Sequence, residues 1–394
     1  MQENEKRSAR EIFADIPFPL KIVVVVGSIF IVFVICYVTY LTTIYEPKKE
    51  RARIIAISGS PVYAGLLDPS VASNGTNRIM AYTSVSLLAN GSFGTEVMLS
   101  QGQTNCMHWT PLTSKMELRP DTLIGPDLLT PVAHGAWRAE TPSLVYDPAD
   151  AGREWKLFAY RYFWSGSAPL ARLYSVIVMR YASNPLDADW SREQWILSAN
   201  DKAPPEPYAN LTATKLNPLH PDLLDVYFYA RPSVVNVDNV LVMSLSAFVQ
   251  GKDSPDRIIL LASTDHARSW RYLGTALRER DLAGMGAFTR LTGGSLFMKD
   301  KTMYLSAMLG TEDSDAVGAH ILEFENASTA SLRRDARNGS VAILNYLPTQ
   351  KTPPSRLGGG ALAYNDDCPR KTFMSESLTG QRHDIFVHPV SPVN

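Results

Sequence analysis

The sequence predicts an all-β fold, a five-bladed β-propeller preceded by one transmembrane α-helix. Three observations lead to this fold class: an uncharged apolar run near the N-terminus, a short phrase that recurs five times after it, and the near-absence of helical periodicity beyond the run. Helices repeat every 3.6 residues and strands every 2, so the last observation favours β-structure. The predicted organisation is a cytoplasmic tail at 1–21, the helix at 22–44, a juxtamembrane linker at 45–52 and the propeller at 53–394.

The apolar run extends from Ile22 to Ile44 without one charged side chain. A hydrocarbon core of ~30 Å needs about 20 apolar residues in helical conformation, so the run is long enough to span a bilayer. A cleaved signal peptide fits less well, because its apolar part is roughly 7–15 residues long and ends in small residues. This run instead continues into Tyr45, Glu46 and Pro47. We therefore expect an uncleaved signal-anchor helix.

Basic residues flank the run equally on both sides, so the positive-inside rule does not choose an orientation. They are Lys6, Arg7, Arg10 and Lys21 before the run, and Lys48, Lys49, Arg51 and Arg53 after it. A short tail before an uncleaved anchor is the usual signal-anchor layout. We therefore expect a single-pass membrane protein whose large C-terminal domain is periplasmic or extracellular, with the lipid bilayer as a partner.

Charges are nearly balanced over the chain, with 38 Lys+Arg and 39 Asp+Glu. No basic run occurs beyond the residues next to the membrane, which argues against a nucleic-acid partner.

A short phrase recurs five times in the predicted propeller. It reads Asp68-Pro-Ser-Val, Thr141-Pro-Ser-Leu, Arg231-Pro-Ser-Val, Gly293-Gly-Ser-Leu and Gly359-Gly-Ala-Leu. A turn and an apolar strand follow each copy. Each unit of about 60–90 residues has room for the four short strands of a propeller blade. The phrase therefore marks the start of each of five blades.

Ring closure can be predicted from the two ends of the domain. The last unit, after Gly359, is one strand short of a blade, and the segment Arg53–Ser58 could supply its outer strand. Such closure would remove the exposed sheet edges that favour aggregation. Cys106 and Cys368 fall in the first and last units. In a closed ring they could form a disulfide in an oxidising compartment, and two buried free thiols are the alternative.

With these features the chain resembles the five-bladed propeller glycosidases, namely the arabinanase/xylosidase and invertase-like families. The resemblance covers most of the predicted propeller as architecture and is carried by short motifs. Asp68-Pro69 is similar to the motif that holds the base or nucleophile of these families, and Glu140-Thr-Pro142 is similar to their Glu-x-Pro acid motif. Glycoside cleavage needs one carboxyl group to protonate the leaving oxygen and another to attack or to activate water. The resemblance thus implies catalytic roles for Asp68 and Glu140.

The chain departs from the family pattern at three points. The Glu-x-Pro motif lies in the second unit, whereas these families place it in the third. The third unit carries Arg231-Pro232 instead, and no second Asp beside a matching proline completes the acidic trio. Asp147-Pro148 lies near the turn end of its hairpin. If the protein is an enzyme, Arg231 would contact an acidic or hydroxylated substrate.

A second resemblance is local and concerns the Asp-box of sialidase-type propellers. Ser263, Asp265 and Trp270 occupy the motif positions, with Ala267 where glycine is expected. In that motif the Asp accepts hydrogen bonds from backbone N–H groups and the Trp packs on the blade. The resemblance implies a structural turn between outer strands, far from the axis.

No metal or cofactor site is predicted. Glu312, Asp313 and Asp315 lack the regular ligand spacing of an EF-hand. The seven histidines lack the spacing of zinc ligands.

Two functional hypotheses follow. The main one is a non-catalytic structural or docking subunit of a larger membrane protein complex, such as a respiratory or photosynthetic assembly. It is based on the anchor, the incomplete carboxylate set and Arg231. The alternative is a membrane-tethered glycoside hydrolase or glycan-binding protein that uses Asp68 and Glu140.

Overall fold

The computed structural model describes the propeller part of the chain. The described residues are 53–57, 65–88, 93–124, 131–165, 172–199, 208, 211–312, 316–349, 361–368, 371–379, 382–389 and 391–393. The predicted tail, transmembrane helix and linker lie outside these ranges. Within them, no helix is long and apolar enough to cross a membrane.

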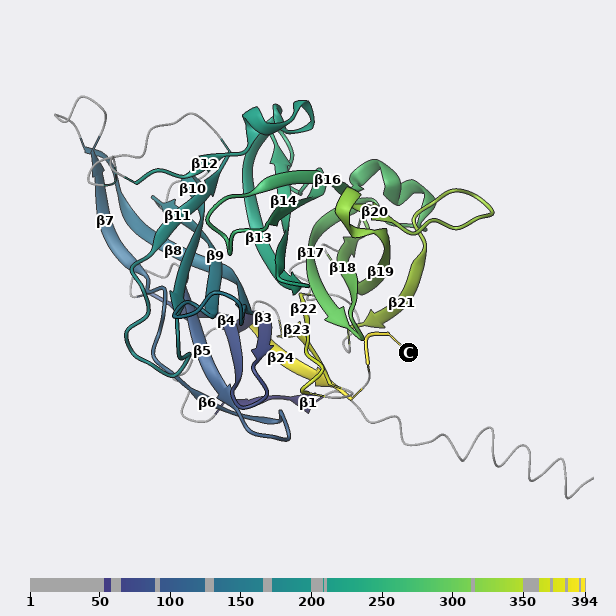
Figure 1. Cartoon of the computed structure of the whole chain (residues 1–394). Helices are drawn as coiled ribbons and strands as arrows, with labels where there is room; N and C mark the ends of the chain where they lie inside the picture. The colour runs from purple at the N-terminus through teal and green to yellow at the C-terminus, as the bar shows by residue number, and fades with distance from the viewer. Residues whose placement is uncertain are drawn as a thin grey trace, which may run out of the picture. The chain divides into compact units, whose positions relative to one another are not determined.

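Residues 52–394 form one compact unit, an all-β propeller of five blades (Figure 1). This confirms the predicted propeller fold. Each blade is a small sheet whose first strand lines the central axis, and later strands lie progressively further out. Blade 1 contains β3 (Gly65–Ser73), β4 (Arg78–Leu87), β5 (Phe93–Gly102) and β6 (His108–Pro111). Blade 2 contains β8 (Pro131–Tyr146), β9 (Trp155–Trp164), β10 (Arg172–Ala182), β11 (Gln194–Ser198) and β12 (Thr214–Lys215), with β7 (Arg119–Ile124) on the other edge of β8.

The other three blades follow the same plan. Blade 3 contains β13 (Val226–Val237), β14 (Val240–Val249), β15 (Arg257–Ser263) and β16 (Arg271–Arg278). Blade 4 contains β17 (Arg290–Lys299), β18 (Thr302–Gly310), β19 (Gly318–Asn326), β20 (Ser331–Leu332) and β21 (Ile343–Pro348). Blade 5 contains β22 (Leu362–Tyr364), β23 (Thr372–Thr379) and β24 (Arg382–His388). Short 3₁₀ helices connect some strands: η2 (Asn217–Leu219), η3 (Pro221–Leu223), η4 (Glu279–Gly284) and η5 (Ala327–Thr329).

The blades pack face to face, so both faces of their inner strands are buried. Strand β9 shows the consequence, since Trp155 to Phe163 are all buried. Alternate side chains point to opposite faces of a strand. Accordingly, Leu157 packs with blade 1 residues, whereas Phe158 packs with blade 3 residues. This two-sided burial explains why β9 carries apolar side chains on both of its faces, with Lys156 and Arg161 as buried exceptions.

The serine of the repeated phrase links neighbouring blades. In three blades its hydroxyl accepts a hydrogen bond from a backbone N–H of the next blade, at distances of 2.7–2.9 Å. The pairs are Leu144 N to Ser70 Oγ, Val234 N to Ser143 Oγ and Leu296 N to Ser233 Oγ. In blade 5, Ala361 replaces the serine and has no hydroxyl with which to continue the series toward blade 1.

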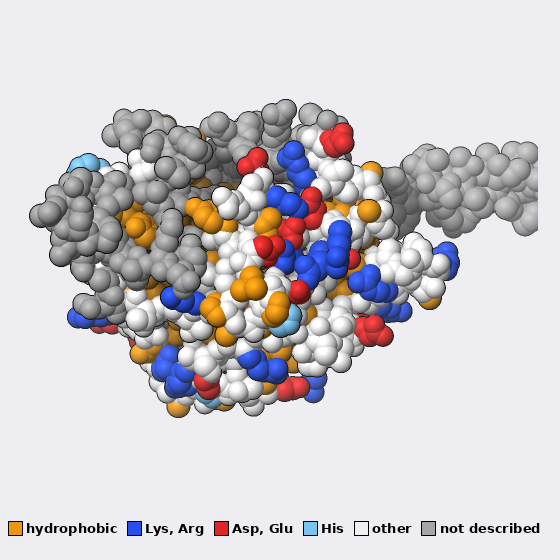
Figure 2. Space-filling view, turned by 90° about the horizontal axis from the view of Figure 1, so that it is seen from above, with side chains coloured by type: hydrophobic (Ala, Val, Ile, Leu, Met, Phe, Trp, Pro, Cys, Tyr) orange, Lys and Arg blue, Asp and Glu red, His pale blue; other side chains and the backbone are white. Residues whose placement is uncertain are grey.

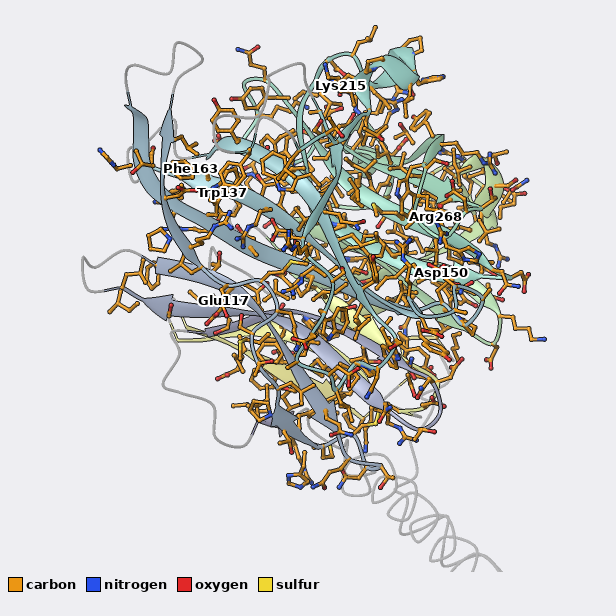
Figure 3. The ribbon with its side chains drawn as sticks, turned by 60° about the vertical axis from the view of Figure 1, so that its left-hand side comes forward. Glu117, Trp137, Asp150, Phe163, Lys215 and Arg268 are labelled. Atoms are coloured by element: carbon orange, nitrogen blue, oxygen red, sulfur yellow. A yellow bond between two sulfur atoms is a disulfide. The ribbon has the colours of Figure 1, made fainter. Side chains whose placement is uncertain are left out.

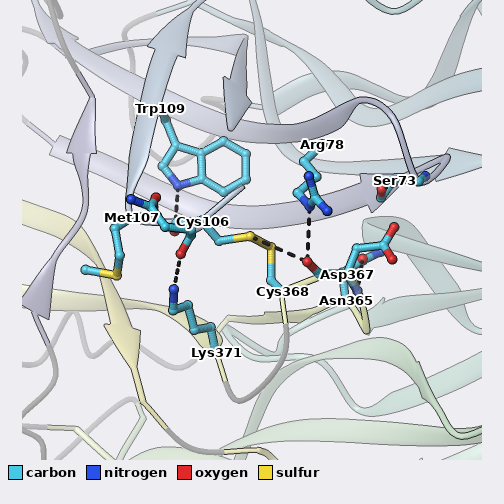
Figure 4. Close-up of a disulfide and its surroundings, with 11 residues drawn as sticks. Ser73, Arg78, Cys106, Met107, Trp109, Asn365, Asp367, Cys368 and Lys371 are labelled. Carbon is cyan, nitrogen blue, oxygen red and sulfur yellow. Dashed lines mark hydrogen bonds between the residues drawn. A yellow bond between two sulfur atoms is a disulfide. The ribbon is translucent and has the colours of Figure 1, made fainter. Parts of the chain in front are cut away.

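The joint between blades 5 and 1 is held by other means. Strand β1 (Arg53–Ile54) pairs antiparallel with β24, and β2 (Ala56–Ile57) then pairs parallel with β6 of blade 1. A disulfide joins Cys106 to Cys368, whose Cα atoms are 5.9 Å apart (Figure 4). Nearby, Arg78 Nε donates to the carbonyl oxygen of Asp367 at 3.1 Å. The first described residues therefore contact both blades at the joint.

Candidate functional site

The first residue of the repeated phrase adopts a strained conformation in three blades. Asp68, Thr141 and Arg231 have φ values of 51°, 53° and 55°. Each lies at an irregularity in the pairing of the first two strands of its blade. Left-handed conformation costs a non-glycine residue about 1–3 kcal/mol and is common at functional sites. A proline follows each residue, and a bulge tolerates proline because no ladder hydrogen bond is required there.

The strained residues lie between two cavities on the propeller axis. One cavity has a volume of about 280 Å³ and the other about 830 Å³. Asp68, Thr141 and Arg231 line both of them. One face of the molecule is shown in Figure 2, where acidic and basic side chains intermingle near the centre beside hydrophobic ones. We call the larger cavity the funnel.

Asp68 is held at both carboxylate oxygens. Its Oδ1 is 3.4 Å from Arg231 Nη1, and its Oδ2 accepts a hydrogen bond of 3.2 Å from the hydroxyl of Thr83. The Asp68 side chain is 14% exposed and that of Arg231 is 34% exposed. Gly293 leaves space for the arginine, because a Cβ at that position would be 2.6 Å from Arg231 Cδ. Three blades thus contribute to the placement of one ion pair.

Glu140 also lines the funnel, but not the smaller cavity. It directly precedes the strained residue of blade 2, whereas Asp68 is itself the strained residue of blade 1. Glu140 Oε1 is buried and has no hydrogen-bond partner among the described residues, and the same is true of Thr141 Oγ1. Buried polar atoms are normally hydrogen-bonded, so these two groups are candidates for contact with a ligand or with water.

The rim of the funnel carries a separate ion-pair network. Lys252 Nζ lies 2.7 Å from Asp256 Oδ1 and 2.5 Å from Glu279 Oε2. Hydrogen bonds to Asp256 and Glu279 raise the pKa of Lys252, against the effect of burial. Lys252 therefore stays protonated, and its positive charge is balanced by the two carboxylates. Arg231 and Arg290 are the other cationic side chains that line the funnel among the described residues.

The turn with the Asp-box resemblance lies between β15 and β16, outside both cavities. Asp265 accepts hydrogen bonds from the Ser263 hydroxyl and from the backbone N–H groups of Arg268 and Ser269. Burial alone would raise the pKa of Asp265, but the hydrogen bonds from Ser269 and Ser263 lower it to about 2. Trp270 is buried and contacts Phe158 of blade 2, with ring centroids 6.1 Å apart.

Asp147 belongs to a buried network that the sequence did not reveal. Lys156 Nζ is 2.9 Å from a carboxylate oxygen of Asp147 and 2.9 Å from one of Asp150. From blade 3, His266 Nδ1 reaches Asp147 at 2.9 Å, and Arg268 reaches Asp150 at 3.0 Å (Figure 3). This network joins blades 2 and 3 near the Asp-box turn and away from the funnel.

No group of three or more His, Cys, Asp or Glu side chains that could hold a metal occurs among the described residues. Glu312 lines the funnel, while Asp313 and Asp315 lie outside the described ranges.

No protein-family model matches the chain, and no curated protein matches it. Solved structures do share its fold. One of them, a BT0996 RGII complex, is 12% identical, with a TM-score of 0.51, over 88% of this chain and 94% of that protein. Another, described as "Glycoside hydrolase", gives the same identity, TM-score and coverage. A protein of unknown function from Dyadobacter fermentans DSM 18053 is 11% identical, with a TM-score of 0.50, over 86% of this chain and 97% of its own.

These findings correct the main functional prediction. The expectation of a non-catalytic structural or docking subunit of a membrane complex is wrong, because a protein described as "Glycoside hydrolase" shares the fold over 88% of this chain. In addition, Asp68 and Glu140 line the same funnel. The alternative prediction, a glycoside hydrolase or glycan-binding protein, is favoured. The chain is a five-bladed β-propeller similar in fold to glycoside hydrolases.

Proposed function

We propose that the propeller is a glycoside hydrolase that binds a glycan in the funnel and cleaves it with Asp68 and Glu140. The observation that carries this proposal is the pairing of two differently held carboxyl groups in one cavity. Asp68 accepts hydrogen bonds at both oxygens, whereas one oxygen of Glu140 has no partner among the described residues. Glycosidases need one group that stays ionised and one that can carry a proton.

The contacts of each carboxyl group suggest its role. Arg231 and the Thr83 hydroxyl both donate to Asp68, which favours the ionised form and suits a base or nucleophile. Glu140 Oε1 is free of protein donors among the described residues, so a proton on this group would be available to a leaving oxygen. The neighbouring Thr141 Oγ1 also has no partner there and could bind a sugar hydroxyl.

We further propose that the propeller lies outside the cytoplasm, in the periplasm or the extracellular space. The Cys106–Cys368 disulfide supports this location, because disulfides persist in oxidising compartments.

We also propose that Ser263, Asp265 and Trp270 form an Asp-box with a purely structural role. The hydrogen bonds of Asp265 and its absence from the funnel lining support that role.

The test is hydrolysis of a panel of oligosaccharides and chromogenic glycosides by the purified full-length chain. Asp68→Asn and Glu140→Gln should each lower kcat/KM by about 10²–10⁴-fold, the usual contribution of one acid or base group. Glu325→Gln changes an exposed carboxylate on β19 and serves as the control that keeps full activity. Glycan binding without turnover would replace the hydrolase by a glycan-binding protein. Neither binding nor turnover with any glycan would refute both.

A further inference from the structure

Thr83 connects the two candidate carboxyl groups. It lies on β4 of blade 1 and is fully buried. Its Oγ1 accepts a hydrogen bond of 2.9 Å from the backbone N–H of Thr141 and donates one of 3.2 Å to Asp68 Oδ2. Thr141 directly follows Glu140 in the chain, so one side chain spans the gap between the Asp68 carboxylate and the backbone that carries Glu140.

The direction of these two bonds is fixed by chemistry. A hydroxyl has a single proton to donate, and a backbone N–H can only donate. Because the Thr141 N–H occupies a lone pair of Oγ1, the Thr83 proton is left to point toward Asp68. The receiving oxygen must then act as an acceptor. An ionised carboxylate is acceptor-only at both oxygens, whereas protonation turns one of its oxygens into a donor and weakens it as a partner for Thr83.

The corresponding positions in the next two blades lack this arrangement. Thr83 pairs with Leu67, the residue before the strained Asp68, whereas Tyr160 pairs with Glu140 and Ser246 pairs with Ala230. Ser246 is buried like Thr83, but its hydroxyl has no hydrogen-bond partner among the described residues. We call the two hydrogen bonds of Thr83, to Asp68 and from Thr141, the clamp. The clamp distinguishes blade 1 from blades 2 and 3, so it does not follow from the repeated architecture.

We propose that Thr83 is a positioning residue that keeps Asp68 ionised and oriented toward the funnel. The catalytic meaning of this inference rests on the proposed function, in which Asp68 is the base or nucleophile and Glu140 is the acid. The charged side chains that line the funnel together with Asp68 are Glu140, Arg231, Lys252, Asp253, Glu279, Arg290 and Glu312, and of these Arg231 contacts Asp68 directly.

The test measures the titration midpoint of the Asp68 carboxyl group by ¹³C NMR in the full-length chain, and it needs no substrate. Asp68→Asn identifies the signal. Thr83→Val keeps the side-chain shape but removes the donor, so the midpoint should rise by about one pH unit, because a hydrogen bond to a carboxylate favours its ionised form. Thr83→Ser should restore the wild-type midpoint. Ser246→Ala is the matched control and should leave it unchanged.

An unchanged midpoint in Thr83→Val, or an equal shift in Ser246→Ala, would overturn the inference. If Thr83→Val does not fold, the comparison of Thr83→Ser with Thr83→Ala decides the same question. The hydrolase proposal is tested separately by the Asp68→Asn and Glu140→Gln activities. A shifted midpoint combined with full activity of Asp68→Asn would retain the clamp and refute only the catalytic role.

Discussion

Arg231 Nη1 lies 3.4 Å from Asp68 Oδ1, although 163 residues separate the two in sequence. Both are the first residue of the repeated phrase, both have left-handed backbone conformation, and they belong to blades 1 and 3. The same backbone conformation thus places a carboxylate in one blade and a guanidinium group in another, where the two axial cavities meet. The arginine, which departs from the family pattern in sequence, becomes a direct partner of the candidate base.

Gly293 should be required for this pair. In Gly293→Ala the new methyl group would lie 2.6 Å from Arg231 Cδ and 2.7 Å from Met308 Cε, so the arginine must move. We expect a loss of about 1–3 kcal/mol in the free energy of unfolding, as for other overpacking substitutions. Urea denaturation measures that loss, and a crystal structure of the variant would show Arg231 displaced from Asp68. An unmoved arginine would contradict the prediction.

The serine links between blades should contribute measurably to stability. Ser143→Ala leaves the Val234 N–H without its 2.7 Å acceptor in a buried position, which costs about 1–3 kcal/mol. Ser306→Ala is the matched control, because Ser306 is fully buried and its hydroxyl has no partner among the described residues. Chemical denaturation of the two variants should give a clearly larger loss for Ser143→Ala. Equal losses would mean that the link contributes nothing specific.

Reduction of the Cys106–Cys368 disulfide should destabilise the propeller. The bridge joins residues separated by 262 positions, and the chain-entropy estimate for so long a loop is about 5.5 kcal/mol. Thermal unfolding with and without reductant measures the effect. A Cys106→Ser/Cys368→Ser variant should unfold at the reduced protein's temperature in both conditions. A wild-type Tm insensitive to reductant, with the bridge shown to be reduced, would refute this.

His320 should make stability fall as the solution becomes acidic. Burial lowers the pKa of His320 to about 4, although a hydrogen bond with Ala307 opposes the shift. Unfolding returns the group to its ordinary value of 6.5, so the unfolded chain binds the proton more readily than the folded chain between these two values. Stability linked to His320 is therefore complete above pH ~6.5, falls through that window by on the order of 3 kcal/mol, and levels off below it.

Denaturation curves at about pH 7, 5.5 and 4, which bracket that window, measure the dependence on pH for the wild type and for His320→Gln. The glutamine variant cannot take up the proton, and its stability should fall less steeply over this window. Identical slopes for the two proteins would show that another group is responsible.

The sequence predicted the propeller because the phrase that begins each blade is a short, local signal. It also named Asp68 and Glu140, since an acid close to a proline is visible in one dimension. Thr83 could not be found in this way, because its role depends on a contact with Asp68 across the β3–β4 pair and on a contact with Thr141 of the next blade. The serine of the phrase was visible in the repeated copies, but its use as a link between blades was not inferred.

The network around Asp147 shows a different limit of sequence reasoning. Asp147 precedes a proline, as Asp68 does, yet it is fully buried against Lys156 and His266 instead of lining the funnel. Asp147 follows the last residue of β8, whereas Asp68 lies at the bulge within β3, and strand pairing decides which of these positions reaches the axis. Charge composition likewise gave no indication of the full rim network of Lys252. Asp256 lies only four residues further along the chain, but the second partner, Glu279, comes from a separate segment.

The replacement of serine by Ala361 gives the joint between blades 5 and 1 a different chemistry from the three joints that connect blades 1 to 4. Where three other joints carry a hydroxyl link, this one relies on a covalent bond that responds to the thiol–disulfide balance of its surroundings. Partial unfolding often proceeds through the least stable cooperative unit of a protein. In reducing surroundings the backbone amides of β1 and β24 would then exchange hydrogen well ahead of those in blades 2 and 3.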